Sequence, residues 1–142
     1  MKRRATDVAE YILQKCGAIP AMKLQKLVYY SQAWALVWDD EPLFSERIEA
    51  WANGPVVRDL YAVHRLQYLV ETVQGDSERL TVTNKETIDA VLDFYGDKSS
   101  QWLSDLTHDE EPWQQAREGI PVGDRSTVEI TPASMAEYYG GL

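Results

Sequence analysis

The sequence predicts a mainly α fold: a compact helical domain of about five to six helices with a small element of two or three β-strands. Two observations predict it. Apolar residues recur every three or four positions over most of the chain, which is the spacing of one face of an α-helix. Short segments with alternating apolar and polar residues lie between these stretches and are typical of strands. No repeat, low-complexity linker or change of composition interrupts the chain, so residues 1–142 are expected to form a single domain.

Two helices are predicted in the first part of the chain, at residues 6–16 and 20–38. Thr6 is a suitable N-cap for the first helix, and Cys16 falls on its apolar side. The second helix begins at Pro20, because proline is favoured in the first turn of a helix. This second helix is apolar around most of its circumference, so we expect it at the centre of the fold.

The middle of the chain is predicted to combine strands with a third helix. A short strand is expected at residues 46–51, followed by a rigid turn at Asn53-Gly54-Pro55 and a helix over residues 56–66. Residues 68–73 fit either the end of that helix or a strand. Leu80-Thr81-Val82 show alternation and are expected to pair with the 46–51 strand.

The remainder of the chain is predicted to be helical on both sides of a loop at residues 120–130. The expected helical segments begin at a Thr83–Glu86 capping box, at Ser99 or Ser100, at Pro112 and at Thr131-Pro132.

The charge of the chain restricts its partners. It carries 23 Asp and Glu against 14 Lys and Arg, a net charge of −9. Binding to phosphates needs clustered Lys and Arg, so this charge disfavours nucleic acid, whereas an acidic surface steers association with a basic partner. Lys23 and Lys26 are about one turn apart and are interpreted as the solvated edge of the second helix.

The sequence also indicates a compartment. It has no run of 18 apolar residues and no signal-peptide pattern at its start, so we expect a cytoplasmic protein without a membrane span. Cys16 is the single cysteine, which excludes an internal disulfide and fits a reduced environment.

Motifs for catalysis, cofactors and metals are not found in the sequence. It has no glycine-rich phosphate loop, no G-x-S-x-G and no H-E-x-x-H. His64, His108 and Cys16 are far apart in the chain and would hold a metal only if the fold brought them together. We therefore predict no catalytic, cofactor-binding or metal residue, and expect that the protein is not an enzyme. One enzymatic alternative would use His108, Asp109 and Glu110.

The aromatic content is unusual, with five Trp and eight Tyr against two Phe. Trp and Tyr have large apolar surfaces with one polar group, so they suit both cores and interfaces. We expect most of the tryptophans in the core and at least one at a partner surface.

Residues 22–61, MKLQKLVYYSQAWALVWDDEPLFSERIEAWANGPVVRDLY, resemble the Panacea domain, the antitoxin domain also called SocA-like. The family pattern is K-x-Q-K-L-x-Y-Y-[SA]-Q-x-W, then P-L-F, then I-x-A-W-x-x-G-P-V-x-x-x-[VL]-Y. Downstream, LTHDEEPWQQAR at residues 106–117 is similar to the family segment L-[ST]-H-x-x-x-P-W-x-x-[AT]-[RY]. A glycine common in the family is Ala33 here, and alanine is the better helix former. The pattern residues expected to be structural are Gln25, Leu27, Tyr29, Trp34, Gly54, His108, Pro112 and Trp113.

The resemblance implies an antitoxin of a two-gene toxin–antitoxin system, of the kind found in bacteria, phages and prophages. Such domains neutralise unrelated toxins, mostly by direct protein contact, and no enzymatic activity is assigned to them. One branch is a proteolytic adaptor that delivers its toxin to an ATP-dependent protease, and this alternative stays open. The implied partner is a toxin encoded by an adjacent gene, and a homo-oligomer or a hetero-complex remains possible. A DNA-binding autoregulator is disfavoured by the charge and by the lack of a basic recognition helix.

Two interpretations of the binding surface follow. The corner at Asn53-Gly54-Pro55 either sets the angle between strand and helix or belongs to the toxin-binding face. A domain used against many toxins must vary its surface on a fixed frame, so contacts are slightly favoured in the less patterned residues 67–82 and 118–142. The candidate partner-binding residues are Trp51, Pro55, Tyr68, Tyr138 and Tyr139.

Overall fold

The computed structural model describes residues 2–142, and within them it has seven α-helices and two small antiparallel sheets. The helices are α1 (Ala5–Cys16), α2 (Ala21–Trp38), α3 (Arg58–His64), α4 (Val82–Tyr95), α5 (Ser100–His108), α6 (Glu111–Ala116) and α7 (Pro132–Gly140). The strands are β1 (Ile19–Pro20), β2 (Ile48–Trp51), β3 (Gly54–Val57), β4 (Leu69–Val70) and β5 (Glu129–Ile130), and a 3₁₀ turn covers Ser77–Arg79. The predicted fold class, mainly α with a small β element, is confirmed.

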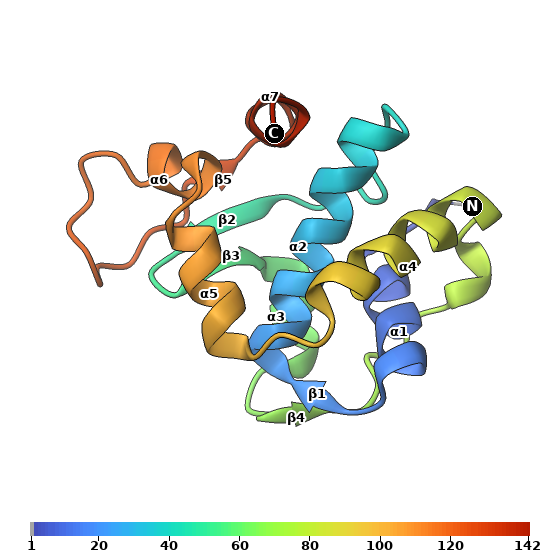
Figure 1. Cartoon of the computed structure of the whole chain (residues 1–142). Coiled ribbons are helices and arrows are strands. Elements are labelled where there is room, and N and C mark those ends of the chain that lie inside the picture. Colours follow the sequence, from blue (N-terminus) through green and yellow to red (C-terminus); the bar gives the residue numbers. More distant parts are fainter. Residues whose placement is uncertain (1) are drawn as a thin grey trace.

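Helix α2 lies at the centre of the molecule. Its buried residues run without a break from Leu24 to Ala33, which is possible only if neighbours cover the helix on nearly every side. Helices α1, α4, α5 and α7 and strand β3 pack against it (Figure 1). Leu24, Leu27 and Val28 are fully buried, and each such side chain stabilises the fold by about 1.5–3 kcal/mol. The predicted central position of this helix is confirmed.

The larger sheet has the strand order β3-β2-β5, with β2 in the middle. Trp51 of β2 pairs with Gly54 of β3, and Ile48 of β2 pairs with Ile130 of β5. The predicted pairing of residues 80–82 with β2 is therefore wrong. Those residues instead lead into α4: the Thr81 hydroxyl accepts a hydrogen bond from the Asn84 N–H at 3.1 Å and caps the helix, which begins before the predicted capping box.

The smaller sheet joins β1 to β4, with Ile19 opposite Val70. This pairing decides the ambiguity over residues 68–73 in favour of a strand. The sheet holds the extended segment after α3 against the link between α1 and α2, and this segment contributes to the candidate site below.

Residues 54–57 form β3, where the sequence predicts a turn followed directly by a helix. Val56 and Val57 are buried, and their apolar side chains satisfy the pattern of a helix as well as that of a strand. Their β-branched side chains fit the strand better. Helix α3 consequently starts later and ends earlier than the predicted 56–66 range.

The ends of the first two helices also differ from the prediction. Arg4, not Thr6, is the N-cap of α1, and the Asp7 carboxylate accepts a hydrogen bond from the Arg4 N–H at 2.8 Å. Cys16 is exposed, so its predicted place on the buried side of α1 is wrong. It is the last residue of α1, and Gly17, with φ of 76°, turns the chain away immediately after it. Pro20 is the N-cap of α2 and not its first helical residue.

Candidate functional site

Two glutamines of the α2 pattern lie inside the protein and connect the helix to other segments. The Gln25 amide accepts a hydrogen bond from the Val57 N–H at 2.9 Å and donates to the Val57 carbonyl at 3.3 Å. The Gln32 amide accepts from the Leu43 N–H at 2.7 Å and donates to the Phe44 carbonyl at 2.9 Å. Buried polar groups are costly without partners, so these pairs fix β3 and the segment after α2 relative to the helix.

His64 is held by the same network. Its Nε2 lies 2.9 Å from the Gln25 Nε2, a contact in which the neutral ring nitrogen accepts from the amide. Burial lowers the pKa of His64, which keeps the ring neutral in this position.

The Asn53-Gly54-Pro55 corner covers the side chain of Lys26. Lys26 is fully buried and its Nζ donates to the Pro55 carbonyl at 3.2 Å, so its predicted place on a solvated edge is wrong. Gly54 has φ of +125°, and a Cβ at this position would lie 2.5 Å from Lys26 Cε and 3.2 Å from Thr107 Oγ1. Both the backbone conformation and the space therefore require glycine here. This geometry supports the architectural interpretation of the corner.

Side chains of the downstream pattern segment, residues 106–117, hydrogen-bond to the main chain of β2. The Trp113 indole N–H donates to the Trp51 carbonyl at 2.9 Å, and the Trp113 ring stacks on His108 with centroids 4.1 Å apart. Arg117 is buried beside this ring and donates to the Ala50 carbonyl at 3.0 Å. Pro112 is buried in the first turn of α6.

Glu110, the N-cap of α6, lies in a buried cluster of tyrosines. The hydroxyls of Tyr30 and Tyr139 each donate to Glu110 Oε1 at 2.7 Å. The Tyr29 hydroxyl lies 3.0 Å from that of Tyr139 and donates to it, because the Tyr139 proton is engaged with Glu110. Burial raises the pKa of Glu110 and the pKa of each of these tyrosines. The cluster joins α2, α6 and α7.

The three residues of the enzymatic alternative have different surroundings. Glu110 points into the tyrosine cluster, the His108 ring stacks on Trp113, and Asp109 is exposed. Within residues 2–142, no group of three or more His, Cys, Asp and Glu side chains is arranged to hold a metal ion.

The helices of residues 2–142 do not have the properties of membrane spans. None of them combines the length and the apolar character that crossing a bilayer requires.

An exposed apolar surface lies at the C-terminal end of α3 and in the residues after it, and we call it the apolar ledge. It consists of Val63, Leu66, Tyr68 and Leu69, of which Leu66 is 95% and Tyr68 80% exposed. Leu66 has φ of +72°, a left-handed conformation that is uncommon for any residue except glycine. Helix α3 has already ended at His64, where Arg65 is the C-cap with ψ of 147°, so Leu66 lies in the turn after the helix.

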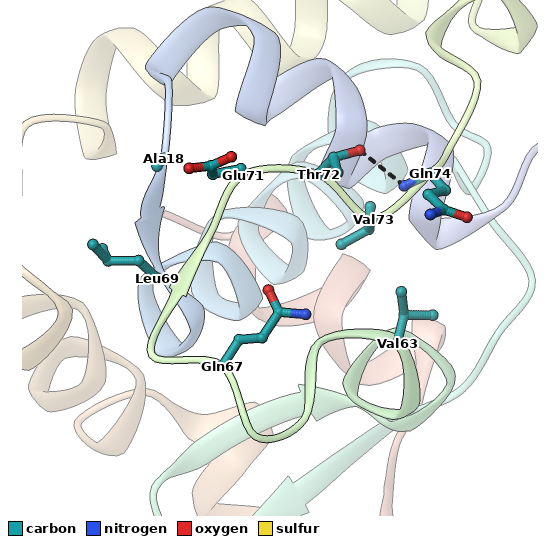
Figure 2. Close-up of a pocket in the computed structure, with 8 residues that line it drawn as sticks. All are labelled: Ala18, Val63, Gln67, Leu69, Glu71, Thr72, Val73 and Gln74. Carbon is teal, nitrogen blue, oxygen red and sulfur yellow. Dashed lines mark hydrogen bonds between the residues drawn. The ribbon is translucent and has the colours of Figure 1, made fainter.

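A groove of about 540 Å³ adjoins the apolar ledge. Figure 2 shows Val63 on α3 and Val73 on the extended segment pointing toward each other, with Gln67 extending from the loop after α3 into the space beside them. The other lining residues are Ala18, Leu69, Glu71, Thr72 and Gln74. Glu10 holds the rim in place, since its carboxylate accepts hydrogen bonds from the Thr72 hydroxyl at 2.8 Å and the Val73 N–H at 2.9 Å.

The five candidate partner-binding residues differ in their exposure to solvent. Tyr68 lies on the apolar ledge, and Trp51 and Tyr138 are partly buried. Pro55 and Tyr139 are buried, because the first covers Lys26 and the second donates to Glu110, so neither side chain is offered to a partner in this conformation.

Sequence reasoning missed Val63 and Leu66, and included Leu69 only as part of the favoured range 67–82. Val63 and Leu66 fell within the predicted third helix, where an apolar residue is expected to face the core. The signal that could have found Leu66 is the Leu66-Gln67-Tyr68-Leu69 run itself, which continues the helical spacing of α3 poorly.

The tryptophans are less buried than expected. Trp38 is 52% and Trp102 41% exposed, while Trp34, Trp51 and Trp113 are partly buried. The expectation of most tryptophans in the core is therefore wrong, because each indole lies near the edge of the packed interior.

A family model described as "Antitoxin SocA-like, Panacea domain" matches residues 24–114, which is more than half of the chain. The match extends from the first turn of α2 into α6. No curated protein and no solved structure matches the chain.

Replacing Gly54 tests the packing of the corner. We expect Gly54→Ala to lower the free energy of unfolding by about 2–4 kcal/mol, because it adds strain at positive φ and a clash with Lys26. Gly123→Ala is the matched control: Gly123 also has positive φ, but a Cβ added there would meet no atom within 4 Å, so only about 1–2 kcal/mol should be lost. Urea unfolding measures both, and equal losses would contradict the role of Lys26.

The buried Lys26 predicts a pH dependence of stability. Burial lowers the pKa of Lys26 from its usual 10.5 to about 7. Between pH 7 and pH 10 the unfolded chain therefore binds a proton that the folded chain does not, so the free energy of unfolding rises with pH. The contribution of Lys26 to this pH dependence approaches about 1.4 kcal/mol per pH unit, and the contribution disappears below pH 7.

Urea unfolding from pH 6 to pH 9.5 measures this slope. Lys26→Met should remove the contribution, whereas Lys23→Met, one turn away on the same helix, should leave it in place. An unchanged slope in Lys26→Met would show that another group causes it.

Proposed function

Because the chain belongs to the SocA-like antitoxin family, with the Panacea domain matching residues 24–114, we propose that it neutralises a cognate toxin by binding to it directly. The family supports the antitoxin role. The proposal adds that neutralisation occurs by direct binding. It assigns the binding surface to the apolar ledge and its groove.

The observation that carries this proposal is the exposure of large apolar side chains on a rigid support. Leu66, Tyr68 and Leu69 stand out from the molecule, and burying one such side chain under a partner contributes about 1.5–3 kcal/mol. Tyrosine is also enriched among residues that dominate binding energies. The rim is fixed by Glu10, so little conformational entropy is lost when a partner binds.

The division between frame and surface supports the same proposal. Gln25, Lys26 and Gln32 direct their polar groups inward, where they hold other segments of the chain. The apolar ledge lies between the two patterned segments 22–61 and 106–117. Its side chains can therefore change to fit a particular toxin while the frame stays the same.

We further propose that the protein performs no chemistry on the toxin and acts in the cytoplasm on the product of an adjacent gene. The polar groups that are best placed for chemistry, Glu110 and its tyrosines, are hydrogen-bonded to one another inside the frame. Surface contact is then the means by which the protein acts.

Charge introduced on the apolar ledge tests the proposal. The double variant Leu66→Asp and Tyr68→Asp should fold normally, because both side chains are exposed, and should weaken toxin binding at least about 100-fold by placing carboxylates in an apolar interface. Co-purification and titration calorimetry with the product of the adjacent gene measure binding, and growth of cells expressing both genes measures neutralisation.

The double variant Val122→Asp and Val128→Asp is the matched control, since it adds the same charge at exposed valines, of which Val122 is 98% exposed, and should bind like the wild type. Equal binding by the ledge variant would reject the apolar ledge as the site. Neutralisation accompanied by a shortened toxin half-life would favour proteolytic delivery instead.

A further inference from the structure

A second exposed aromatic surface lies on α4 and the end of α2. The exposed residues of α4 and its C-terminal extension, at positions 86, 90, 93, 94 and 97, share one side at spacings of three and four. This side consists of Phe94, which is 60% exposed, Ala90 and three acidic residues. No element of residues 2–142 covers it. We call the combination of Trp38, Phe94 and the surrounding carboxylates the acidic aromatic face.

A hydrogen bond holds the residue after α2 against α4. The Thr87 hydroxyl donates to Asp39 Oδ2 at 2.6 Å, and Thr87 and Phe94, seven residues apart, lie on the same side of the helix. Trp38 precedes Asp39, is 52% exposed, and stacks on Trp34 with centroids 5.0 Å apart. The end of α2 that carries Trp38 is therefore held against the helix that carries Phe94, and the two helices pack against each other in Figure 1.

Acidic side chains outnumber basic ones around these rings, although Arg3, Lys15 and Lys98 each pair with one of the carboxylates. The segments 34–46, 86–97 and 131–142, contributed by α2, α4 and α7 with their flanking residues, contain no Lys and no Arg. Helices α4 and α7 both pack against α2. Their acidic residues are Asp39, Asp40, Glu41, Glu46, Glu86, Asp89, Asp93, Asp97 and Glu137.

Some of these carboxylates have partners within the described chain, but others do not. Arg3 lies 3.6 Å from Glu41, Lys15 lies 4.0 Å from Asp89, and Lys98 lies 3.5 Å from Asp97. The side chains of Asp40, Glu86 and Asp93 make no ion pair within residues 2–142 and are exposed. A ligand that covers Phe94 and Trp38 must approach through this uncompensated negative charge.

We propose that the acidic aromatic face binds a lysine- and arginine-rich helix of a partner protein. The charge repels a second copy of this chain and repels nucleic acid, but it attracts a basic segment and speeds its association. Lysine and arginine also suit the rings: their aliphatic stems cover apolar surface, and their cationic groups bind above Trp and Phe. This inference goes beyond the proposed function, because the surface is separate from the apolar ledge and leaves it free for the toxin.

A synthetic basic peptide tests the proposal on the full-length protein. The probe is an amphipathic helix with leucines at spacings of three and four and lysine or arginine elsewhere. We expect it to shift the amide resonances of residues 86–97 and to change the fluorescence of Trp38. A peptide with glutamate in place of the basic residues should not bind, and binding of the basic peptide should weaken as salt is raised from about 50 to 300 mM. Shifts confined to other elements would overturn the proposal.

Charge reversal with a matched control distinguishes binding at this face from attraction to the net charge of the protein. Glu86→Lys combined with Asp93→Lys should weaken peptide binding at least about tenfold, a loss of roughly 1.4 kcal/mol. Glu118→Lys combined with Asp124→Lys has the same net charge, alters exposed residues of another segment, and should bind within about twofold of wild type. Equal weakening by both pairs would show attraction to the overall charge and reject the face as a site.

The apolar-ledge variant Leu66→Asp with Tyr68→Asp should bind the basic peptide as wild type does. Loss of peptide binding in that variant would place the peptide on the ledge and overturn the proposal. Loss of toxin binding alone concerns the proposed function and leaves this inference intact.

Discussion

The fold depends on satisfying the polar side chains that α2 carries into the interior. Leaving one buried donor or acceptor without a partner costs about 1–3 kcal/mol. Gln25, Lys26 and Gln32 meet this requirement by binding main-chain groups of β3, the corner after β2 and the segment after α2. Tyr29 and Tyr30 meet it through Tyr139 and Glu110. One helix thereby fixes the position of most of the chain, so the surface residues are not needed to hold the fold together.

Much of the helical framework could be predicted from the sequence, because apolar periodicity and capping residues are local signals. The lack of a polar side identifies helix α2, α5 begins at Ser99, one of its two predicted caps, and α7 begins at the predicted Thr131-Pro132. The sheet could not be predicted in the same way. Its partners, β2 and β5, are about 80 residues apart in the chain, and nothing local in Glu129 and Ile130 specifies that pairing.

The candidate site was only partly predictable, because exposure depends on where a helix stops. Tyr68 was identified from its place in a less patterned segment. Leu66 was not, since its exposure follows from the end of α3 at His64 and from a left-handed backbone conformation. The sequence suggests Pro55 and Tyr139 as partner residues because it does not show which side chains lie next to them. In the structure their neighbours are Lys26 and Glu110, and these contacts close both positions to a partner.

The hydrogen bond from Tyr139 to Glu110 crosses the limit of the family match. Residue 139 lies 25 positions beyond residue 114, yet its hydroxyl is one of the two that donate to the buried Glu110 carboxylate. A fragment trimmed to the recognised pattern would open the tyrosine cluster to water and leave Ile48 without its neighbour on β5. The residues matched by the family model are thus fewer than the residues needed to complete the core. Expression of the matched residues alone would produce a molecule with an incomplete interior.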